Sequence, residues 1–145
     1  MSIDILGEFQ SKPIDCISIG KISEDVFNSI KEHAPDFACK IKNRTVFFWK
    51  NRIEHISKHK NDANNLGLDE ILSVIPTVIS SPDYIGVVNK NDKESLQFVK
   101  RLDNGFLVAI RLNDKGNLSF RTAYSITDSQ ITDYLRKKKF VGICY

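Results

Sequence analysis

The sequence predicts an α+β fold in which N-terminal helices pack on one face of a four-stranded antiparallel meander sheet, followed by a C-terminal helix. The sheet is indicated by four runs rich in β-branched and aromatic residues, separated by short segments of Asn, Asp, Lys and Gly. These runs are 84–88, 96–101, 106–112 and 118–124. Short connections join antiparallel neighbours. A chain of 145 residues that is 41% hydrophobic can form one domain with one core, so we expect a single domain over residues 1–145.

Helix signals are clearest in three places. Ser23 is a good N-cap before Glu24 and Asp25, whose charges suit a first helical turn, and Pro35 should end that helix. Asp69 should open a second helix that ends near residues 80–83. The last helix should run from Asp128 to about residue 136. Outside the meander, we expect strands or extended segments at 3–6, 13–22 and 45–49.

Residues 52–60 contain two of the three histidines, with lysines and an arginine beside them. If this stretch is helical, His55 and His59 share one face because they are four residues apart, while Ile53 and Ile56 anchor the helix in the core. Histidine can donate or accept a proton near neutral pH, which suits acid–base catalysis. Two alternatives remain open: an incidental pair on a surface helix, and a metal site, for which no suitable third ligand is obvious.

The turns of the meander also predict which cations share a sheet face. A two-residue turn at Asn104-Gly105 and a three-residue turn at 114–116 would place Lys100, Arg111 and Arg121 on one face. Such a face is either a solvated surface or a phosphate-binding floor, since Arg offers a fork suited to phosphate oxygens. The same alternation puts Thr122 and Tyr124 on the opposite face unless the strand twists or bulges there.

Composition limits the class of protein. The net charge of +3, from 21 Lys and Arg against 18 Asp and Glu, is compatible with a polyanionic partner. The three cysteines include no CxxC pair, so a disulfide framework and a Cys-based zinc site are not expected. The sequence shows no signal-peptide pattern and no apolar segment near the roughly 18 residues of a membrane span. We therefore expect a cytoplasmic protein without membrane association.

Four strings, taken in order, resemble elements of the phage-associated nuclease domains of the Barnase–EndoU–Colicin–RelE (BECR) superfamily. They are Ile-Gly-Lys-Ile at 19–22, His-Ile-Ser-Lys-His at 55–59, Ile-Ser-Ser-Pro-Asp-Tyr-Ile at 79–85, and Phe-Arg-Thr-Ala-Tyr at 120–124. The resemblance spans about residues 14–139. It implies an active site on the open face of the sheet. It also implies a ribonuclease that needs neither metal nor cofactor, in which the 2′-hydroxyl of the RNA attacks the adjacent phosphate and leaves a 2′,3′-cyclic phosphate.

Carried over residue by residue, the resemblance assigns candidate catalytic roles to two motifs. The catalytic candidates are His55, His59, Arg121, Thr122 and Tyr124. Candidate substrate-binding residues are Lys58, within the histidine motif, and Lys100 and Arg111, which come from the predicted sheet register. Histidines would move protons, Arg121 would stabilise the charge of the transition state, and Thr122 and Tyr124 would position the substrate.

The sequence therefore predicts a toxin- or effector-like endoribonuclease of phage or mobile-element origin. Its partners would be RNA, either tRNA or mRNA, and a cognate acidic inhibitor that covers the basic face. One alternative is a non-catalytic RNA- or protein-binding module on the same scaffold, which would keep the basic face without depending on the histidines. Another is a phage structural or accessory protein with no salt-sensitive RNA affinity.

Overall fold

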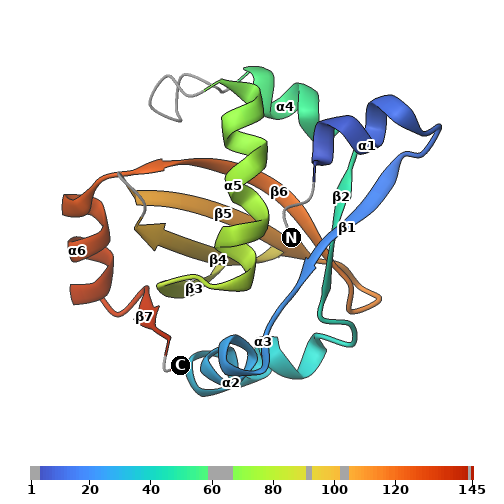
Figure 1. The fold of residues 1–145 in the computed structure, drawn as a ribbon. Helices are drawn as coiled ribbons and strands as arrows, with labels where there is room; N and C mark the ends of the chain where they lie inside the picture. The colour runs from blue at the N-terminus through green and yellow to red at the C-terminus, as the bar shows by residue number, and fades with distance from the viewer. Residues whose placement is uncertain (1–3, 59–66, 91–92, 102–104, 144) are drawn as a thin grey trace.

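The computed structural model describes residues 4–58, 67–90, 93–101, 105–143 and 145. Seven strands form one mixed sheet in the order β1-β2-β6-β5-β4-β3-β7 (Figure 1). The strands are β1 (Cys16–Lys21), β2 (Thr45–Trp49), β3 (Tyr84–Lys90), β4 (Lys93–Arg101), β5 (Gly105–Leu112), β6 (Leu118–Ile126) and β7 (Val141–Gly142). The helices are α1 (Ile5–Ser11), α2 (Glu24–His33), α3 (Pro35–Lys40), α4 (Arg52–Lys58), α5 (Leu68–Ser80) and α6 (Asp128–Arg136).

The α+β class and the antiparallel meander β3-β4-β5-β6 are confirmed, but a four-stranded sheet is too small. Strand β2 pairs in parallel with β6, β1 pairs with β2, and β7 pairs with β3. Each of these three strands pairs with a strand that is distant in the sequence, so no short turn in the sequence indicates the pairing. Within the described part of the chain, no helix has the length and apolar character to cross a bilayer.

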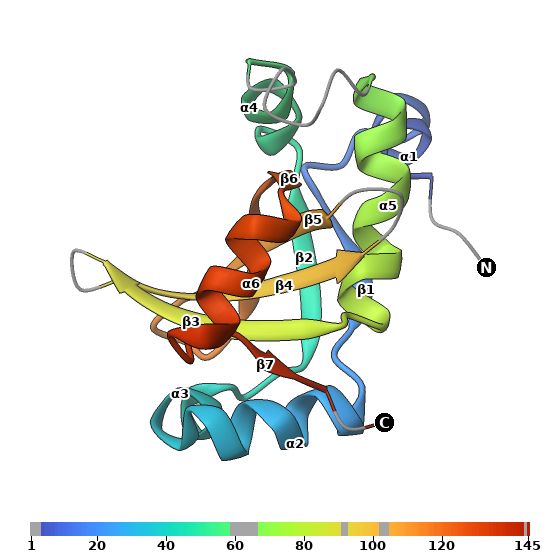
Figure 2. The ribbon, with the colours of Figure 1, turned by 90° about the vertical axis from the view of Figure 1, so that its left-hand side faces the viewer.

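Helices α5 and α6 lie on opposite sides of the sheet (Figure 2), and a hydrophobic cluster lies on each side. The larger cluster lies under α1, α2 and α5 and includes Ile30, Phe48, Ile75, Phe98 and Phe120, all at most 2% exposed. The smaller cluster lies on the other face, where α6 packs Ile131 against β4, β5 and β6. Because α6 is short, it covers only one end of that second face.

The helix boundaries follow local capping. The Ser23 side chain accepts a hydrogen bond from the Val26 backbone, as the N-cap prediction requires. Pro35 ends α2 and also occupies the first turn of α3, a position where its missing N–H costs nothing. The strand expected at 3–6 is wrong: α1 begins at Ile5 because the Asp4 side chain caps it by accepting from the Gly7 backbone.

The register predicted between β4 and β5 is also wrong. Lys100 pairs with Phe106, and Arg101 with Gly105, so residues 102–104 connect the strands instead of the Asn104-Gly105 pair alone. The error is three residues, an odd number, and an odd shift turns every side chain of β4 to the opposite face. Lys100 therefore lies on the face covered by α5, away from Arg111.

Candidate active site

The face of the sheet that carries Arg111 is here called the arginine face. Its side chains on β5 are Leu107, Ala109 and Arg111, whose partners on β6 are Tyr124, Thr122 and Ser119. Val99 and Gln97 of β4 continue the same rows. Helix α6 covers the Leu107 end of this face, and Arg111 lies at the other end, two rows further along the strands.

A β-bulge on β6 decides which of its side chains reach this face. Ile110 pairs with Phe120 and Ala109 pairs with Thr122, so Arg121 is an extra residue without an opposite partner. Before the bulge, Ser119 faces the arginine face and Phe120 the core; after it, Thr122 faces the arginine face and Ala123 the core. The bulge thus brings Arg121, Thr122 and Tyr124 to one side, as bulges near functional sites commonly re-aim side chains.

Arg52, the first residue of α4, holds the bulge in place. Its guanidinium donates from Nε and from Nη2 to the backbone carbonyl of Arg121, with distances of 2.9 and 2.6 Å to the oxygen. Strand β2 pairs with β6 only at Leu118 and Ser119, so the ladder on that side ends before Arg121. Helix α4 follows β2 directly and packs against β6 there, and a side chain replaces the strand as hydrogen-bond donor.

Arg52, Arg111 and Arg121 form an arginine cluster whose charges repel one another. Burial, followed by repulsion from Arg121 and Arg111, lowers the pKa of Arg52, and burial with repulsion from Arg121 lowers the pKa of Arg111. The Arg111 Nε atom is buried and has no hydrogen-bond partner. Among the described residues, none of the three arginines forms an ion pair with a carboxylate. Concentrated positive charge with an unused donor is the electrostatic requirement of an anion site.

The helix expected over residues 52–60 is confirmed as far as Lys58, where α4 ends. His55 lies three residues after Arg52 in α4, so both project from the same side of the helix, about 4.5 Å apart along its axis. Ile56 is 2% exposed and anchors α4 in the core, as expected. His59 and the side chain of Lys58 lie outside the described residues. The described residues contain no group of three or more His, Cys, Asp or Glu side chains suited to a metal ion.

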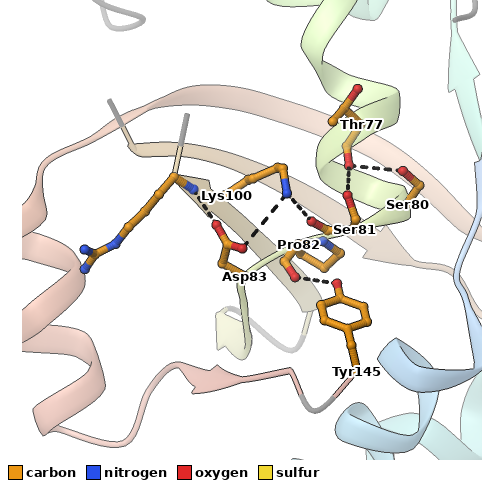
Figure 3. A network of polar contacts seen from close by, with 8 residues as sticks. Thr77, Ser80, Ser81, Pro82, Asp83, Lys100 and Tyr145 are labelled. Atoms are coloured by element: carbon orange, nitrogen blue, oxygen red, sulfur yellow. Dashed lines mark hydrogen bonds and ion pairs between the residues drawn. The ribbon is translucent and has the colours of Figure 1, made fainter. Parts of the chain in front are cut away.

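Lys100 belongs to a structural network on the other face (Figure 3). Its ammonium donates to the Ser81 carbonyl at 2.7 Å and lies 4.0 Å from the Asp83 carboxylate. The other Asp83 oxygen accepts from the Arg101 backbone, and the Tyr145 hydroxyl donates to the Pro82 carbonyl. The Pro82-Asp83 string, singled out by the sequence, thus joins the end of α5 to β4 and the C-terminus. Lys100 is not part of the site that we propose below.

Tyr124 lines a separate cavity of about 370 Å³ next to the arginine cluster. Burial, followed by the neighbouring Tyr134, raises the pKa of Tyr124, so its phenol stays neutral through the physiological range. Arg52 is a site residue that the motifs of the sequence did not single out, although its position three residues before His55 was a usable signal. Nothing in the sequence indicated that Tyr134 lies beside Tyr124, because α6 meets the sheet only in the folded chain.

The mixed sheet thus carries an arginine cluster that no carboxylate of the described residues neutralises, with a histidine-bearing helix beside it, and such a site suits a phosphate-containing ligand. The sequence matches the family model described as phage-Barnase-EndoU-ColicinE5/D-RelE like nuclease3 over residues 21–133. The chain therefore belongs to this family of phage-associated nucleases. Searches of curated proteins and of solved structures found no significant match.

Proposed function

We propose that the chain is an endoribonuclease that cleaves RNA by transesterification. The 2′-oxygen forms a new bond to the adjacent phosphorus, the bond from phosphorus to the 5′-oxygen breaks, and the products carry a 2′,3′-cyclic phosphate and a 5′-hydroxyl. The observation that carries this proposal is the arginine cluster, whose charge is not neutralised within the described chain. Such fixed charge stabilises the additional negative charge of a pentacoordinate phosphorus.

Each candidate residue has a role that its chemistry allows. Arg111 and Arg121 contact the phosphate that reacts, and Thr122, next to the bulge, donates its hydroxyl to a phosphate oxygen. His55 and His59 share the transfer of two protons, one taken from the 2′-hydroxyl and one given to the 5′-oxygen. Lys58 adds charge near the entering RNA, and Tyr124 contacts a base. Arg52 acts as a positioning residue, through the carbonyl of Arg121.

Incubation of RNA with the purified protein in excess EDTA tests this proposal. Wild type should give fragments that end in a 2′,3′-cyclic phosphate, and an RNA with 2′-deoxy substitution at the cut should resist cleavage. His59→Ala and Arg121→Ala should abolish the reaction. Arg44→Ala is the matched control, because it removes the same charge from a side chain that packs on Phe27 of α2, 4.2 Å from the ring centre.

The outcome also separates the rival functions. RNA could instead stay intact but bind with a strong salt dependence. If substitution of Arg111 or Arg121 abolished this binding and substitution of the histidines did not, the protein would be a binding module instead of an enzyme. RNA that neither binds nor is cleaved would favour a structural role. Cleavage that requires a divalent cation would overturn the metal-independent mechanism.

The proposed biological setting is a phage-derived toxin or effector that acts on tRNA or mRNA in the cytoplasm. A producing cell would then need an inhibitor, and an acidic protein would fit the arginine face. Co-expression with candidate acidic neighbours, scored by recovery of growth and by formation of a 1:1 complex, tests this part.

A further inference from the structure

We propose that the cavity beside the arginine cluster binds a nucleobase of the RNA and selects the base next to the cut, an inference that rests on the proposed action on RNA. It is here called the tyrosine cavity, after the two rings in its wall. Its described lining comes from β3 to β6, from α6 and from the segment after α6. The lining residues are Val87, Val88, Gln97, Leu107, Tyr124, Tyr134, Lys139 and Phe140.

The position of the tyrosine cavity relative to the arginine cluster is set by the sheet. Tyr124 is two residues beyond Thr122 on β6, and Gln97 is two residues beyond Ser95, the β4 partner of Arg111. Two residues along a strand advance by about 7 Å, with the side chains on the same face. The Gln97 side of the tyrosine cavity therefore lies one row of side chains from Arg111, and the Tyr124 side lies two rows from it. The near side is within the span of a nucleotide held by its phosphate.

The outer wall of the tyrosine cavity depends on a chain reversal after α6. Lys138 has φ of 60°, in the left-handed region, and its N–H bonds to the Leu135 carbonyl. The backbone N–H of Lys139 then bonds to the Tyr134 carbonyl at 2.8 Å, and the Lys139 ammonium lies 5.6 Å from the centre of the Tyr134 ring. The basic segment after α6 thus returns to the sheet, where β7 pairs with β3.

Gly86 makes this close approach possible. A Cβ atom at position 86 would lie 2.4 Å from the Lys139 carbonyl oxygen and 2.8 Å from the Phe140 ring. Phe140 is 2% exposed and contacts the Tyr134 ring edge-on, with ring centres 5.0 Å apart. The wall is therefore packed against the sheet, and its geometry is defined before a ligand enters.

The chemistry of the lining suits a base better than a second phosphate or a hydrophobic side chain. Two tyrosine rings offer flat surfaces of the kind on which bases stack. The Gln97 amide supplies both a donor and an acceptor, and the Lys139 ammonium supplies donors for ring nitrogens or carbonyl oxygens. The described lining includes one cation and no carboxylate, so it complements a neutral, hydrogen-bonding, aromatic ligand attached to a phosphate.

A binding experiment tests the tyrosine cavity without requiring cleavage. The four ribonucleoside 3′-monophosphates, ribose 5-phosphate and inorganic phosphate are titrated into the intact protein and followed by amide NMR shifts. Base stacking should make at least one nucleotide bind about 5- to 150-fold more tightly than ribose 5-phosphate. Shifts near Tyr134 and Lys139 should appear only with ligands that carry a base. Equal affinity for ribose 5-phosphate and for all four nucleotides would overturn the inference.

Variants then connect the tyrosine cavity to base selection. Gln97→Leu and Lys139→Ala should each lower nucleotide affinity while leaving the affinity for inorganic phosphate unchanged. Lys31→Ala is the matched control for Lys139→Ala, because Lys31 also lies over an aromatic ring, 5.9 Å from the centre of Phe27, but on α2. In both cavity variants the bases found at the cut ends should change relative to wild type.

The two proposals fail in different ways. If RNA is cleaved and the distribution of bases at the cuts is the same in wild type and in both cavity variants, base selection by the tyrosine cavity is wrong while the ribonuclease stands. If RNA is not cleaved by wild type but nucleotides bind more tightly than ribose 5-phosphate, the ribonuclease proposal fails and the base site is supported.

Discussion

Replacing Arg111 by methionine should make the protein more stable and its site inactive. Arg111 is partly buried, its Nε has no hydrogen-bond partner among the described residues, and Arg121 repels it. Methionine keeps the apolar stem against the sheet and removes both the orphaned donor and the charge. A fold that stores unfavourable charge at a binding site gains stability when that charge is removed.

The magnitude follows from the unsatisfied donor. Leaving a buried polar group without a partner costs about 1–3 kcal/mol. Because Arg111 retains some exposure, we take about half of this cost and expect the free energy of unfolding of Arg111→Met to rise by about 0.5–1.5 kcal/mol. In a chain of this size, the melting temperature should then rise by about 2–5 °C.

The same substitution should weaken RNA binding. Loss of a charge-assisted hydrogen bond to phosphate removes about 1.5–3 kcal/mol, which corresponds to about 10- to 150-fold in affinity. The slope of log K against log salt should become shallower by about 0.7, the value for one phosphate contact on a single strand. Phosphate at ten times its Kd should stabilise wild type by about 1.4 kcal/mol and Arg111→Met by less.

Urea unfolding, with and without phosphate, and RNA binding at several salt concentrations are the assays. Arg44→Met is the control, because Arg44 packs on the Phe27 ring and its loss should destabilise the protein slightly. A drop in stability of Arg111→Met larger than that of Arg44→Met would refute the view that the arginine cluster is electrostatically strained. Unchanged RNA affinity would refute its role as the phosphate site.

Three further predictions concern the bulge, the tyrosine cavity and the network at Tyr145. Arg52→Lys should lower the cleavage rate at least about 10-fold although the charge is retained, because lysine cannot donate two bonds from a rigid fork to the Arg121 carbonyl; equal kcat for Lys and Arg would show that charge alone matters. Gly86→Ala should lower the free energy of unfolding in urea by about 1–3 kcal/mol, since its Cβ would overlap the Lys139 carbonyl, and it should weaken nucleotide binding; unchanged stability would contradict that contact. Burial, and then the carboxylates of Asp83 and Asp25, raise the pKa of Tyr145 to about 12, so its contribution to stability is complete below pH of about 10 and is lost as pH rises towards 12. The stability difference between wild type and Tyr145→Phe should therefore shrink over this range, and a constant difference would exclude ionisation of Tyr145 as the cause.

Local signals in the sequence predicted the elements that local interactions determine. Ser23 caps α2, Asp128 lies in the first turn of α6, and the meander strands β3 to β6 are all present. The apolar alternation of β5 and of the start of β6 matches the burial of Val108, Ile110 and Phe120 in the core. The strand expected at 3–6 is wrong because the Asp4 side chain caps a helix that begins at Ile5.

The site was predicted less well, because its geometry depends on pairings between distant strands. Lys100 was placed on the wrong face by a turn that is longer than its Asn-Gly pair suggested. The sequence indicated that Arg121 and Thr122 share a face only if the strand twists or bulges. The β5–β6 ladder shows that a bulge is present. The outcome for His59 stays a prediction, since it lies outside the described residues.

By itself, the sequence determined the helix caps, the meander and the segregation of apolar side chains, because these depend on residues only a few positions apart. It also determined which residue types are available for phosphate chemistry. Only the tertiary structure decided which cations meet. The parallel pairing of β2 with β6 brings α4 to the bulge, where Arg52 reaches the Arg121 carbonyl 69 residues away, and the return of the chain after α6 places Lys139 over Tyr134. Such contacts depend on long-range packing and register, which no short stretch of sequence encodes.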